Sequence, residues 1–344
     1  MPQRPARAQG VAIAGASSLL GKELKQVLED RNFPATEISL LDEEDAAGTL
    51  TEAGGEPTFI QEVTEGSFEK SRFVFFTGSE KFTKGFYENA LASGATVIDL
   101  SGGLPDTARP FTWIESLDRV LPPPAVAVPD SGKKPLYRSP GSGVIIGATI
   151  AAALKDLAPS RVAILFMPPV SEAGQAGVDE LVGQTTNLLS FRAIQREVFD
   201  AQVAFNLLCS YGEKRKPTLK AIRDQIAASV AGYLANRAII PAIQLVQAPV
   251  FYGYSFSVYA DFERVPRIRD LETAFRALEV KVASGDEPPP DIVSAAGQSE
   301  IQLARFEADP NVKTGQWIWG VADNLRLSAT NAVRIAEELL AVPA

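Results

Sequence analysis

The chain has 344 residues, of which 46% are hydrophobic and 22% are charged, an ordinary globular composition. Its formal net charge of −9 argues against binding to a nucleic-acid backbone. We find no apolar run of the roughly 20 residues that a membrane span needs, and no signal-peptide pattern. We therefore expect a cytoplasmic protein that binds neither nucleic acid nor a membrane.

Histidine is absent from the whole chain, and the one cysteine is Cys209. Histidine is the commonest acid or base near neutral pH, and a cysteine thiolate is the strongest protein nucleophile. One cysteine cannot form an internal disulfide, and we interpret Cys209 as a small buried apolar residue. No metal site is predicted.

Short apolar strands alternate with helical patterns in the first third of the chain. We predict strands at 11–14, 37–41, 73–76 and 96–100, with helices from about residue 20 and over 82–93. This alternation predicts an α/β fold with a parallel, doubly wound sheet.

Longer elements follow, and they indicate a mixed α+β domain built on a sheet. We predict helices at 144–157, 217–235, 270–283 and 329–340, and strands at 161–166, 242–251 and 255–262.

A glycine-bounded turn, Gly15 to Gly21, joins the first strand to the first helix. Glycines there allow a dinucleotide pyrophosphate to approach the backbone at the helix N-terminus. The candidate contacts are Gly15, Ser17, Ser18, Leu19 and Gly21, with Gly78 after a later strand. Ser18 stands where a glycine would leave the phosphates most room. Two interpretations of the turn therefore remain. It either binds a dinucleotide or belongs to a Rossmann-like fold that binds no nucleotide.

An acidic run, Asp42 to Asp45, follows the second strand. An acid at this position can accept a hydrogen bond from a ribose 2′-hydroxyl, which would favour NAD over NADP. A solvated acidic loop is the alternative interpretation.

Several segments, in order over almost the whole chain, resemble the aspartate-semialdehyde dehydrogenase family and in particular its Usg-like branch. They are 15–21, 40–41, 46–48, 75–79, 97–99, 170–181, 184–185, 205–206, 249–251, Gly253, 321–326 and 329–332. The stretches 170–181 (VSEAGQAGVDEL) and 321–326 (VADNLR) are the most specific.

The resemblance implies a Rossmann-type NAD(P) domain at 1–140 and an α+β dimerisation domain with a mixed sheet at 141–320. A C-terminal helix within 321–344 would return to the first domain, and Asn324 would lie near the nicotinamide. The family is an NADP-dependent oxidoreductase of amino-acid biosynthesis that dephosphorylates aspartyl phosphate reductively through a cysteine thioester. A histidine moves protons, and arginines hold the substrate's phosphate and carboxylate.

The catalytic residues implied by the family are not intact in this sequence. Ser142 stands at the cysteine position and Tyr254 at the histidine position. A serine hydroxyl is far less acidic than a thiol and needs a base beside it, and a phenol with a pKa near 10 is a poor base at neutral pH.

The positions expected to bind the substrate's phosphate and carboxylate, here called the anion anchors, also depart from the family pattern. Pro105 replaces the phosphate-binding arginine, and Gln247 and Tyr252 occupy the positions expected for the carboxylate-binding arginine. Proline carries neither charge nor backbone donor. A Glu/Lys pair of the family is replaced on one helix by Ile222, Arg223 and Gln225.

We favour the hypothesis that this homologue is a non-catalytic structural or regulatory protein, a homodimer or a partner of an active paralogue. An NAD(P)-dependent oxidoreductase with altered chemistry, using Ser142 or Tyr254 on an aldehyde or acyl group, is the first alternative. An NAD(P) sensor without turnover is the second.

Overall fold

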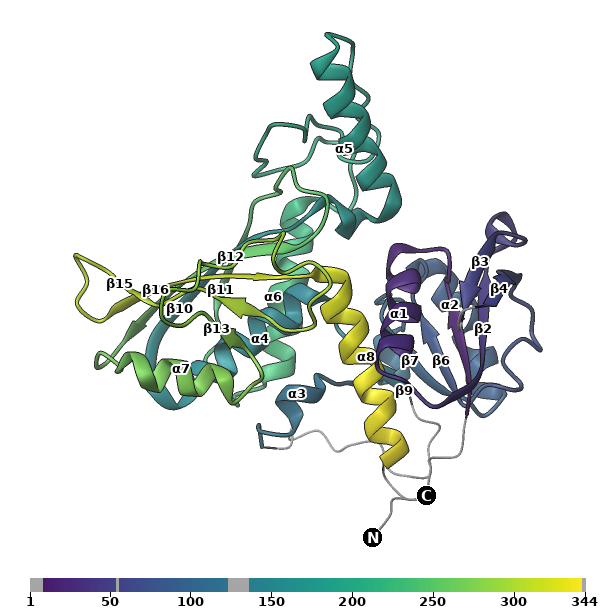
Figure 1. Ribbon diagram of the computed structural model, residues 1–344, viewed down its shortest axis with the longest axis horizontal. Coiled ribbons are helices and arrows are strands. Elements are labelled where there is room, and N and C mark those ends of the chain that lie inside the picture. Colours follow the sequence, from purple (N-terminus) through teal and green to yellow (C-terminus); the bar gives the residue numbers. More distant parts are fainter. Residues whose placement is uncertain (1–8, 54–55, 123–135, 342–344) are drawn as a thin grey trace. The chain divides into compact units, whose positions relative to one another are not determined.

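The computed structural model describes residues 9–53, 56–122 and 136–341, which form two compact units (Figure 1). Unit 1 comprises the described residues up to Glu115, residues 136–141 and residues 328–341. Unit 2 comprises residues 116–122 and 142–327. None of the helices in the described ranges is long and apolar enough to cross a membrane.

Unit 1 is built on a parallel sheet with the strand order β5-β2-β1-β6-β7-β9-β8. The strands are β1 (Gln9–Ala14), β2 (Ala35–Asp42), β5 (Gln61–Glu62), β6 (Phe73–Phe76), β7 (Thr96–Asp99), β8 (Phe111–Thr112) and β9 (Leu136–Arg138). Helices α1 (Leu19–Asp30) and α2 (Glu80–Ala92) follow β1 and β6, and β3 (Leu50–Ala53) pairs with β4 (Glu56–Phe59) as a hairpin.

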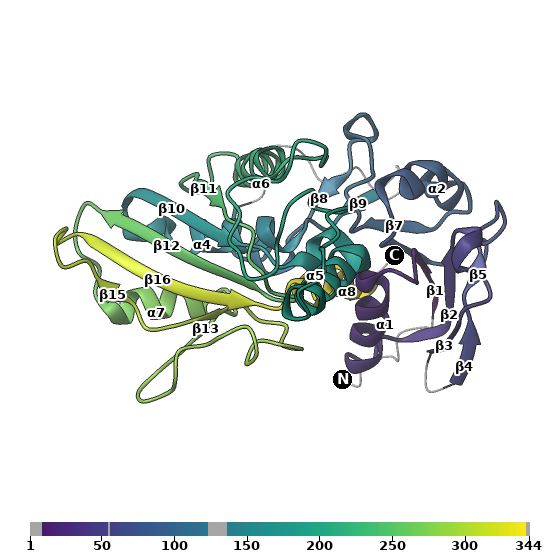
Figure 2. The same ribbon diagram turned by 90° about the horizontal axis from the view of Figure 1, so that it is seen from above.

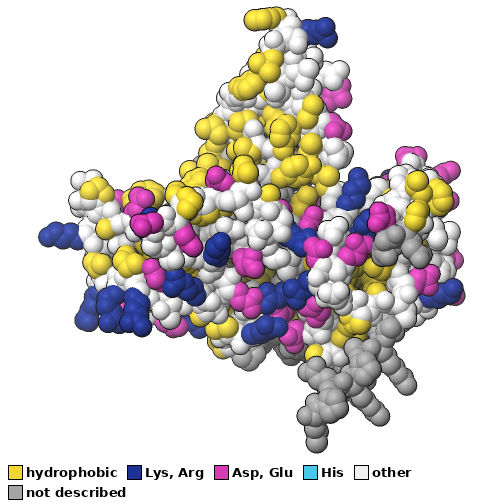
Figure 3. Space-filling model, in the orientation of Figure 1, with side chains coloured by type: hydrophobic (Ala, Val, Ile, Leu, Met, Phe, Trp, Pro, Cys, Tyr) yellow, Lys and Arg dark blue, Asp and Glu magenta, His cyan; other side chains and the backbone are white. Residues whose placement is uncertain are grey.

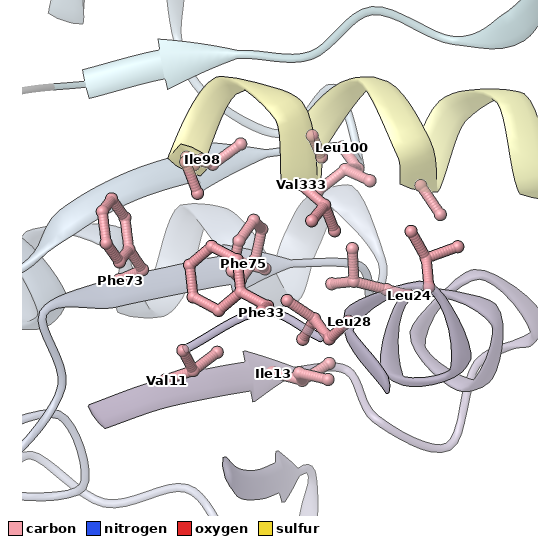
Figure 4. Packing of buried hydrophobic residues seen from close by; sticks show 14 of the residues in the cluster. Val11, Ile13, Leu24, Leu28, Phe33, Phe73, Phe75, Ile98, Leu100 and Val333 are labelled. Atoms are coloured by element: carbon pink, nitrogen blue, oxygen red, sulfur yellow. The ribbon is translucent and has the colours of Figure 1, made fainter. Parts of the chain in front are cut away.

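Both faces of this sheet are buried, as a parallel sheet requires. Along β1, Val11 and Ile13 join one hydrophobic cluster, and the alternate residues Ala12 and Ala14 join the other. Figure 4 shows the first cluster, in which side chains of β1, β6 and α1 meet Val333 of the C-terminal helix. Residues 328–341 of the C-terminal helix therefore complete the hydrophobic core of unit 1.

Unit 2 is built on a mixed sheet with the order β11-β10-β12-β16-β14-β13, and β15 pairs with β16. The strands are β10 (Pro159–Met167), β11 (Ala242–Leu245), β12 (Tyr254–Phe262), β13 (Lys281–Val282), β14 (Gln302–Leu303), β15 (Glu307–Ala308) and β16 (Gly315–Ala322). Figure 2 shows β12 antiparallel between β10 and β16.

Helices of unit 2 lie along one side of the mixed sheet (Figure 1). They are α4 (Ser142–Leu154), α6 (Leu219–Leu234) and α7 (Ile268–Arg276), while α3 (Glu115–Asp118) is short and α5 (Gly174–Leu189) stands apart from the sheet. Every residue of α4 is buried. The predicted fold class, a parallel Rossmann-type sheet plus a mixed sheet, is confirmed.

Three predicted elements have different limits in the structure. The helix predicted over 270–283 ends at Arg276, since Glu279 has a φ of 61° and the chain re-enters the sheet as β13. The strand predicted over 242–251 ends at Leu245. The C-terminal helix α8 (Asn324–Ala341) begins before Ser328, because the Asp323 carboxylate accepts hydrogen bonds from the first-turn amides.

The prediction of a buried Cys209 was wrong, because its side chain is exposed. Cys209 follows Leu208, whose backbone pairs with that of Gln247 in an isolated bridge. This segment lies outside the helices and strands, so it buries little of its own surface.

Candidate functional site

Asn324, the first residue of α8, lies at the centre of a polar cluster in unit 2. Its side chain is almost fully buried. Asn324 Oδ1 accepts a hydrogen bond from the Gly253 amide at 3.0 Å. Asn324 Nδ2 donates to Ser171 Oγ at 3.2 Å and to Glu172 Oε1 at 2.8 Å. One amide side chain therefore joins the start of α8 to the loop before β12 and to the turn before α5.

Glu172 belongs to the short 3-10 helix Val170–Ala173 that precedes α5. Desolvation raises the pKa of its carboxyl group, while the hydrogen bond from Asn324 and the nearby Ser142 hydroxyl lower it. The side chain remains exposed to solvent, which limits this rise. Glu172 is thus a carboxylate with a raised pKa, and the buried amide of Asn324 holds it in place.

Ser142 is the first residue of α4, and its side chain is only 1% exposed. Its Oγ lies near the Glu172 carboxylate, close enough to lower the pKa of that group. Ser142 Oγ is nevertheless a buried polar atom without a hydrogen-bond partner among the described residues.

Tyr254 begins β12, and its side chain is also 1% exposed. Desolvation, followed by the charges of Glu172 and Tyr211, raises the pKa of the phenol well above its ordinary value. A Cβ built on Gly143 would lie 3.3 Å from Tyr254 Oη, so the phenol packs against the first turn of α4. A phenol held in this form donates a hydrogen bond but cannot act as a base near neutral pH.

Gln247 is fully engaged by its neighbours in the loop after β11. Its Nε2 donates to the carbonyls of Pro168 and Ala248, each at 2.9 Å, and its Oε1 accepts from the Tyr211 hydroxyl at 2.7 Å. Burial raises the pKa of Tyr211 to about 12. Gln247 therefore holds loops together and has no donor left for a substrate carboxylate.

The other positions where the sequence departs from the family pattern differ in their surroundings. Pro105 in unit 1 begins a 3-10 turn and is followed by Asp106, which pairs with Arg138 at 3.0 Å. On α6, Arg223 pairs with Asp224 at 2.6 Å. Tyr252 is exposed in the loop before β12.

The glycine turn of unit 1 is compact and needs its first glycine. Gly15 has a φ of 98°, and a Cβ on it would lie 2.1 Å from the Gly78 amide nitrogen. Ser18 has a φ of −63° and does not need the freedom of glycine. Its hydroxyl caps α1 by accepting from Gly21 N and donates to the carbonyl of Thr77, both at 2.9 Å. The Ser18 hydroxyl therefore makes both of these hydrogen bonds within the turn.

Asp42 connects the end of β2 to this turn. Its carboxylate accepts from the Ser17 amide at 2.7 Å and from the Glu43 amide at 2.9 Å. Asp42 is buried, whereas Glu43, Glu44 and Asp45 lie nearer to the surface. The acidic run therefore contains one structural carboxylate followed by surface acids. Leu19 begins α1 immediately after the Ser18 cap.

The structure brings together Ser142, Tyr254 and Asn324 in unit 2, and it places the glycine-turn residues in unit 1. Sequence reasoning missed Glu172 and Tyr211. The signal for Glu172 was available, because it is a lone carboxylate in the otherwise apolar and small-residue stretch 170–178. The distant Tyr211 had no comparable signal.

Comparison with known proteins adds the evolutionary context. A sequence model of the semialdehyde dehydrogenase dimerisation domain matches residues 150–327, just over half of the chain, and one of the NAD binding domain matches residues 10–109. The chain belongs to the semialdehyde dehydrogenase family. Both the parallel sheet of unit 1 and the mixed sheet of unit 2 are thus parts of a semialdehyde dehydrogenase fold.

The similarity to individual relatives extends over nearly the full length of this chain. A USG-1 protein homolog of Pseudomonas aeruginosa is 31% identical over 340 residues, which is 96% of this chain and 97% of the relative. A USG-1 protein homolog of Azotobacter vinelandii is 29% identical over 334 residues with the same coverage. The structure of a probable aspartate-semialdehyde dehydrogenase from P. aeruginosa superposes with a TM-score of 0.82 at 28% identity, covering 97% of this chain and 99% of that chain.

Proposed function

We propose that this member of the semialdehyde dehydrogenase family does not catalyse the family's redox reaction and acts as a structural or regulatory protein. The environment of Tyr254 is the observation that carries the proposal. A buried phenol whose pKa is raised stands at the position where the family resemblance expects a histidine. It cannot exchange a proton with substrate near neutral pH, and the chain contains no histidine to replace it.

The remaining expected groups support the same proposal. Ser142 stands at the position of the nucleophilic thiol and is not activated enough to replace a thiolate in a thioester mechanism. Gln247 is saturated by protein hydrogen bonds, and Pro105 offers no charge. Loss of several members of one catalytic unit removes several orders of magnitude in rate.

We also propose that the protein acts as a homodimer through the mixed sheet and the α5 arm of unit 2. On the sheet, Leu165, Trp317 and Trp319 are partly exposed, although aromatic side chains favour burial. The arm comprises α5 and the residues directly after it, and Figure 3 shows many hydrophobic side chains on it among polar ones. On this arm, Leu189 is 70% and Phe191 99% exposed. Such a concentration of exposed apolar side chains is typical of an interface. An active paralogue of the same fold is the alternative partner for this surface.

An NAD(P) sensor is the second candidate function, and the glycine turn supports it. The backbone approach of Gly15 to Gly78 leaves no room for side chains, and the Ser18 hydroxyl is occupied by Gly21 and Thr77. A pyrophosphate would lie at the start of α1, where the helix N-terminus favours negative charge. A sensor would bind the nicotinamide without hydride transfer, and the exposed acids that follow Asp42 would favour NAD over NADP, since they repel a 2′-phosphate. Calorimetry with NAD, NADH, NADP and NADPH tests this candidate, and absence of binding by all four would exclude it.

A paired activity assay tests the loss of the redox reaction. The wild-type protein and the double variant Ser142→Cys/Tyr254→His are mixed with aspartate semialdehyde, phosphate and either NAD or NADP. Neither should form reduced nicotinamide above the enzyme-free rate, because the anion anchors are also missing. Recovery in the double variant alone would show that Pro105 and Gln247 do not prevent substrate binding. Activity of the wild type would refute the proposal.

A further inference from the structure

Arg215, in the loop before α6, is partly buried, yet its guanidinium has few partners. Its Nη1 donates to the Lys216 carbonyl at 3.3 Å. Its Nε is a buried nitrogen without a hydrogen-bond partner among the described residues. A guanidinium carries five N–H donors, and buried polar groups nearly always have partners. Arg215 therefore keeps donors that the described part of the chain does not satisfy.

The charge of Arg215 is also uncompensated. Two other partly buried arginines of unit 2 each have an aspartate partner, since Arg223 pairs with Asp224 at 2.6 Å and Arg237 with Asp118 at 3.1 Å. Arg215 forms no ion pair with a carboxylate in the described ranges. Taking a charge out of water costs free energy unless a counter-charge compensates it. Arg215 thus favours an anion that comes from outside the chain.

The ring of Tyr211 helps to position the guanidinium. Cζ of Arg215 lies 6.0 Å from the centroid of this ring, and the Phe199 ring lies 5.4 Å from it. The Tyr211 hydroxyl donates to Gln247 at 2.7 Å. Burial raises the pKa of Tyr211, while the positive charge of Arg215 lowers it. An aromatic ring attracts a cation without using its N–H donors, so these donors stay available to a ligand.

Backbone hydrogen bonds fix the loop that carries Arg215. The Gly212 amide donates to the carbonyl of Phe199 at 3.1 Å, and the Arg215 amide donates to the carbonyl of Gly212 at 3.2 Å. The Lys214 amide donates to the Asp200 carboxylate at 3.0 Å. A loop that is ordered before binding loses less entropy when a ligand binds. The position of Arg215 is thus set by the fold of the loop.

The side chains next to Arg215 in the chain add positive charge. Lys214 and Lys216 are both exposed, and neither forms an ion pair with a described carboxylate, including the exposed Glu213. A guanidinium can donate two parallel hydrogen bonds to a phosphate, and lysines on flexible stems add point charges. Three neighbouring positive charges suit a doubly charged phosphate better than a singly charged carboxylate.

We propose that Arg215, Lys214 and Lys216 bind a phosphate group, either as inorganic phosphate or as a small phosphate monoester. The site lies in unit 2, whereas Pro105, at the position where the family resemblance expects the phosphate-binding arginine, lies in unit 1. Bound phosphate would hold the loop 211–216 more firmly. The inference goes beyond the proposed function and does not depend on it, because the site needs neither a nicotinamide nor a redox reaction.

Calorimetry on the full-length protein with inorganic phosphate tests the site, in a buffer without other phosphate or sulfate. We expect saturable binding that Arg215→Ala weakens by about 10- to 100-fold, as loss of hydrogen bonds to a charged group does. Arg215→Lys should weaken it less, because the charge remains and only the paired donors are lost. The matched control is Arg264→Ala, which changes an exposed arginine of unit 2 and should stay within about twofold of the wild type.

Phenyl phosphate and acetate identify the ligand class. Binding of both inorganic phosphate and phenyl phosphate would support a site for monoesters, and binding of inorganic phosphate alone would support a site for the free anion. Absence of saturable binding by either compound, or acetate binding as tightly as phosphate, would overturn the proposal. Equal weakening by Arg215→Ala and Arg264→Ala would overturn it too, because binding would then follow overall charge.

Hydrogen exchange of the wild type decides the question if Arg215→Ala fails to fold. Phosphate should slow exchange in peptides that cover residues 211–216, and the effect should be smaller in Arg215→Lys. Unchanged exchange in the wild type would contradict the proposal. Failure of this site and failure of the proposed function are distinguishable, because these experiments contain neither a semialdehyde nor a nicotinamide.

Discussion

Replacement of Asn324 by alanine should loosen the polar cluster of unit 2. The change leaves the buried Gly253 amide without an acceptor and removes the donor to Ser171 Oγ. The bond to Glu172 contributes less, because water can replace it at an exposed carboxylate. An orphaned buried amide costs about 1–3 kcal/mol and a lost neutral hydrogen bond about 1 kcal/mol, so we expect a loss of about 2–4 kcal/mol in the free energy of unfolding.

Hydrogen exchange measured by mass spectrometry on peptides of β12 is the appropriate assay, since a chain of two units need not unfold in one step. Asn311→Ala is the matched control, because Asn311 is exposed and only its backbone amide bonds to Asp309. It should change the free energy of unfolding by no more than about 0.5 kcal/mol. Equal protection of β12 in Asn324→Ala and wild type would refute the role assigned to Asn324.

Three further perturbations have defined outcomes. Gly15→Ala should unfold unit 1 or destabilise it by more than about 3 kcal/mol, because a Cβ would overlap the backbone after β6. Gly48 has a φ of 80° and open space around a built Cβ, so Gly48→Ala should cost only about 1–2 kcal/mol. Hydrogen exchange on peptides of unit 1 measures both glycine variants. Burial raises the pKa of Asp99, so the folded state keeps its proton at a pH where the unfolded chain has lost it. The stability of unit 1 should therefore fall as pH rises from the ordinary carboxyl range through the raised pKa, and Asp99→Asn should remove that slope in hydrogen exchange. Trp319→Glu should convert a dimer to a monomer in analytical ultracentrifugation, and Leu50→Glu on unit 1 should leave the mass unchanged.

The fold was predictable because its sequence signals are local. The apolar segments of β1 and β6 and the glycine turn at Gly15 specify parallel strands and a tight turn without reference to distant residues. The start of α8 was misplaced because Asp323 and Ser328 are both acceptable helix caps, and only the hydrogen bonds show that Asp323 is the cap used.

The candidate site was predictable in part. The position of Ser142 in the chain could be inferred from the family resemblance, but the approach of Glu172 depends on how α5 and α8 meet around Asn324. Gln247 illustrates the same limit, because the family resemblance leads us to expect an arginine near this position but does not reveal that the glutamine donates to two carbonyls and accepts from Tyr211. Such contacts join residues far apart in the chain and leave no periodic signal.

We propose above that this chain does not perform the redox reaction of the semialdehyde dehydrogenase family. The most direct measurement is the absorbance of reduced nicotinamide after the wild-type protein is mixed with aspartate semialdehyde, phosphate and NADP or NAD. We predict a rate equal to that of the enzyme-free mixture with either cofactor. Formation of reduced nicotinamide that requires both the protein and the semialdehyde would contradict the account.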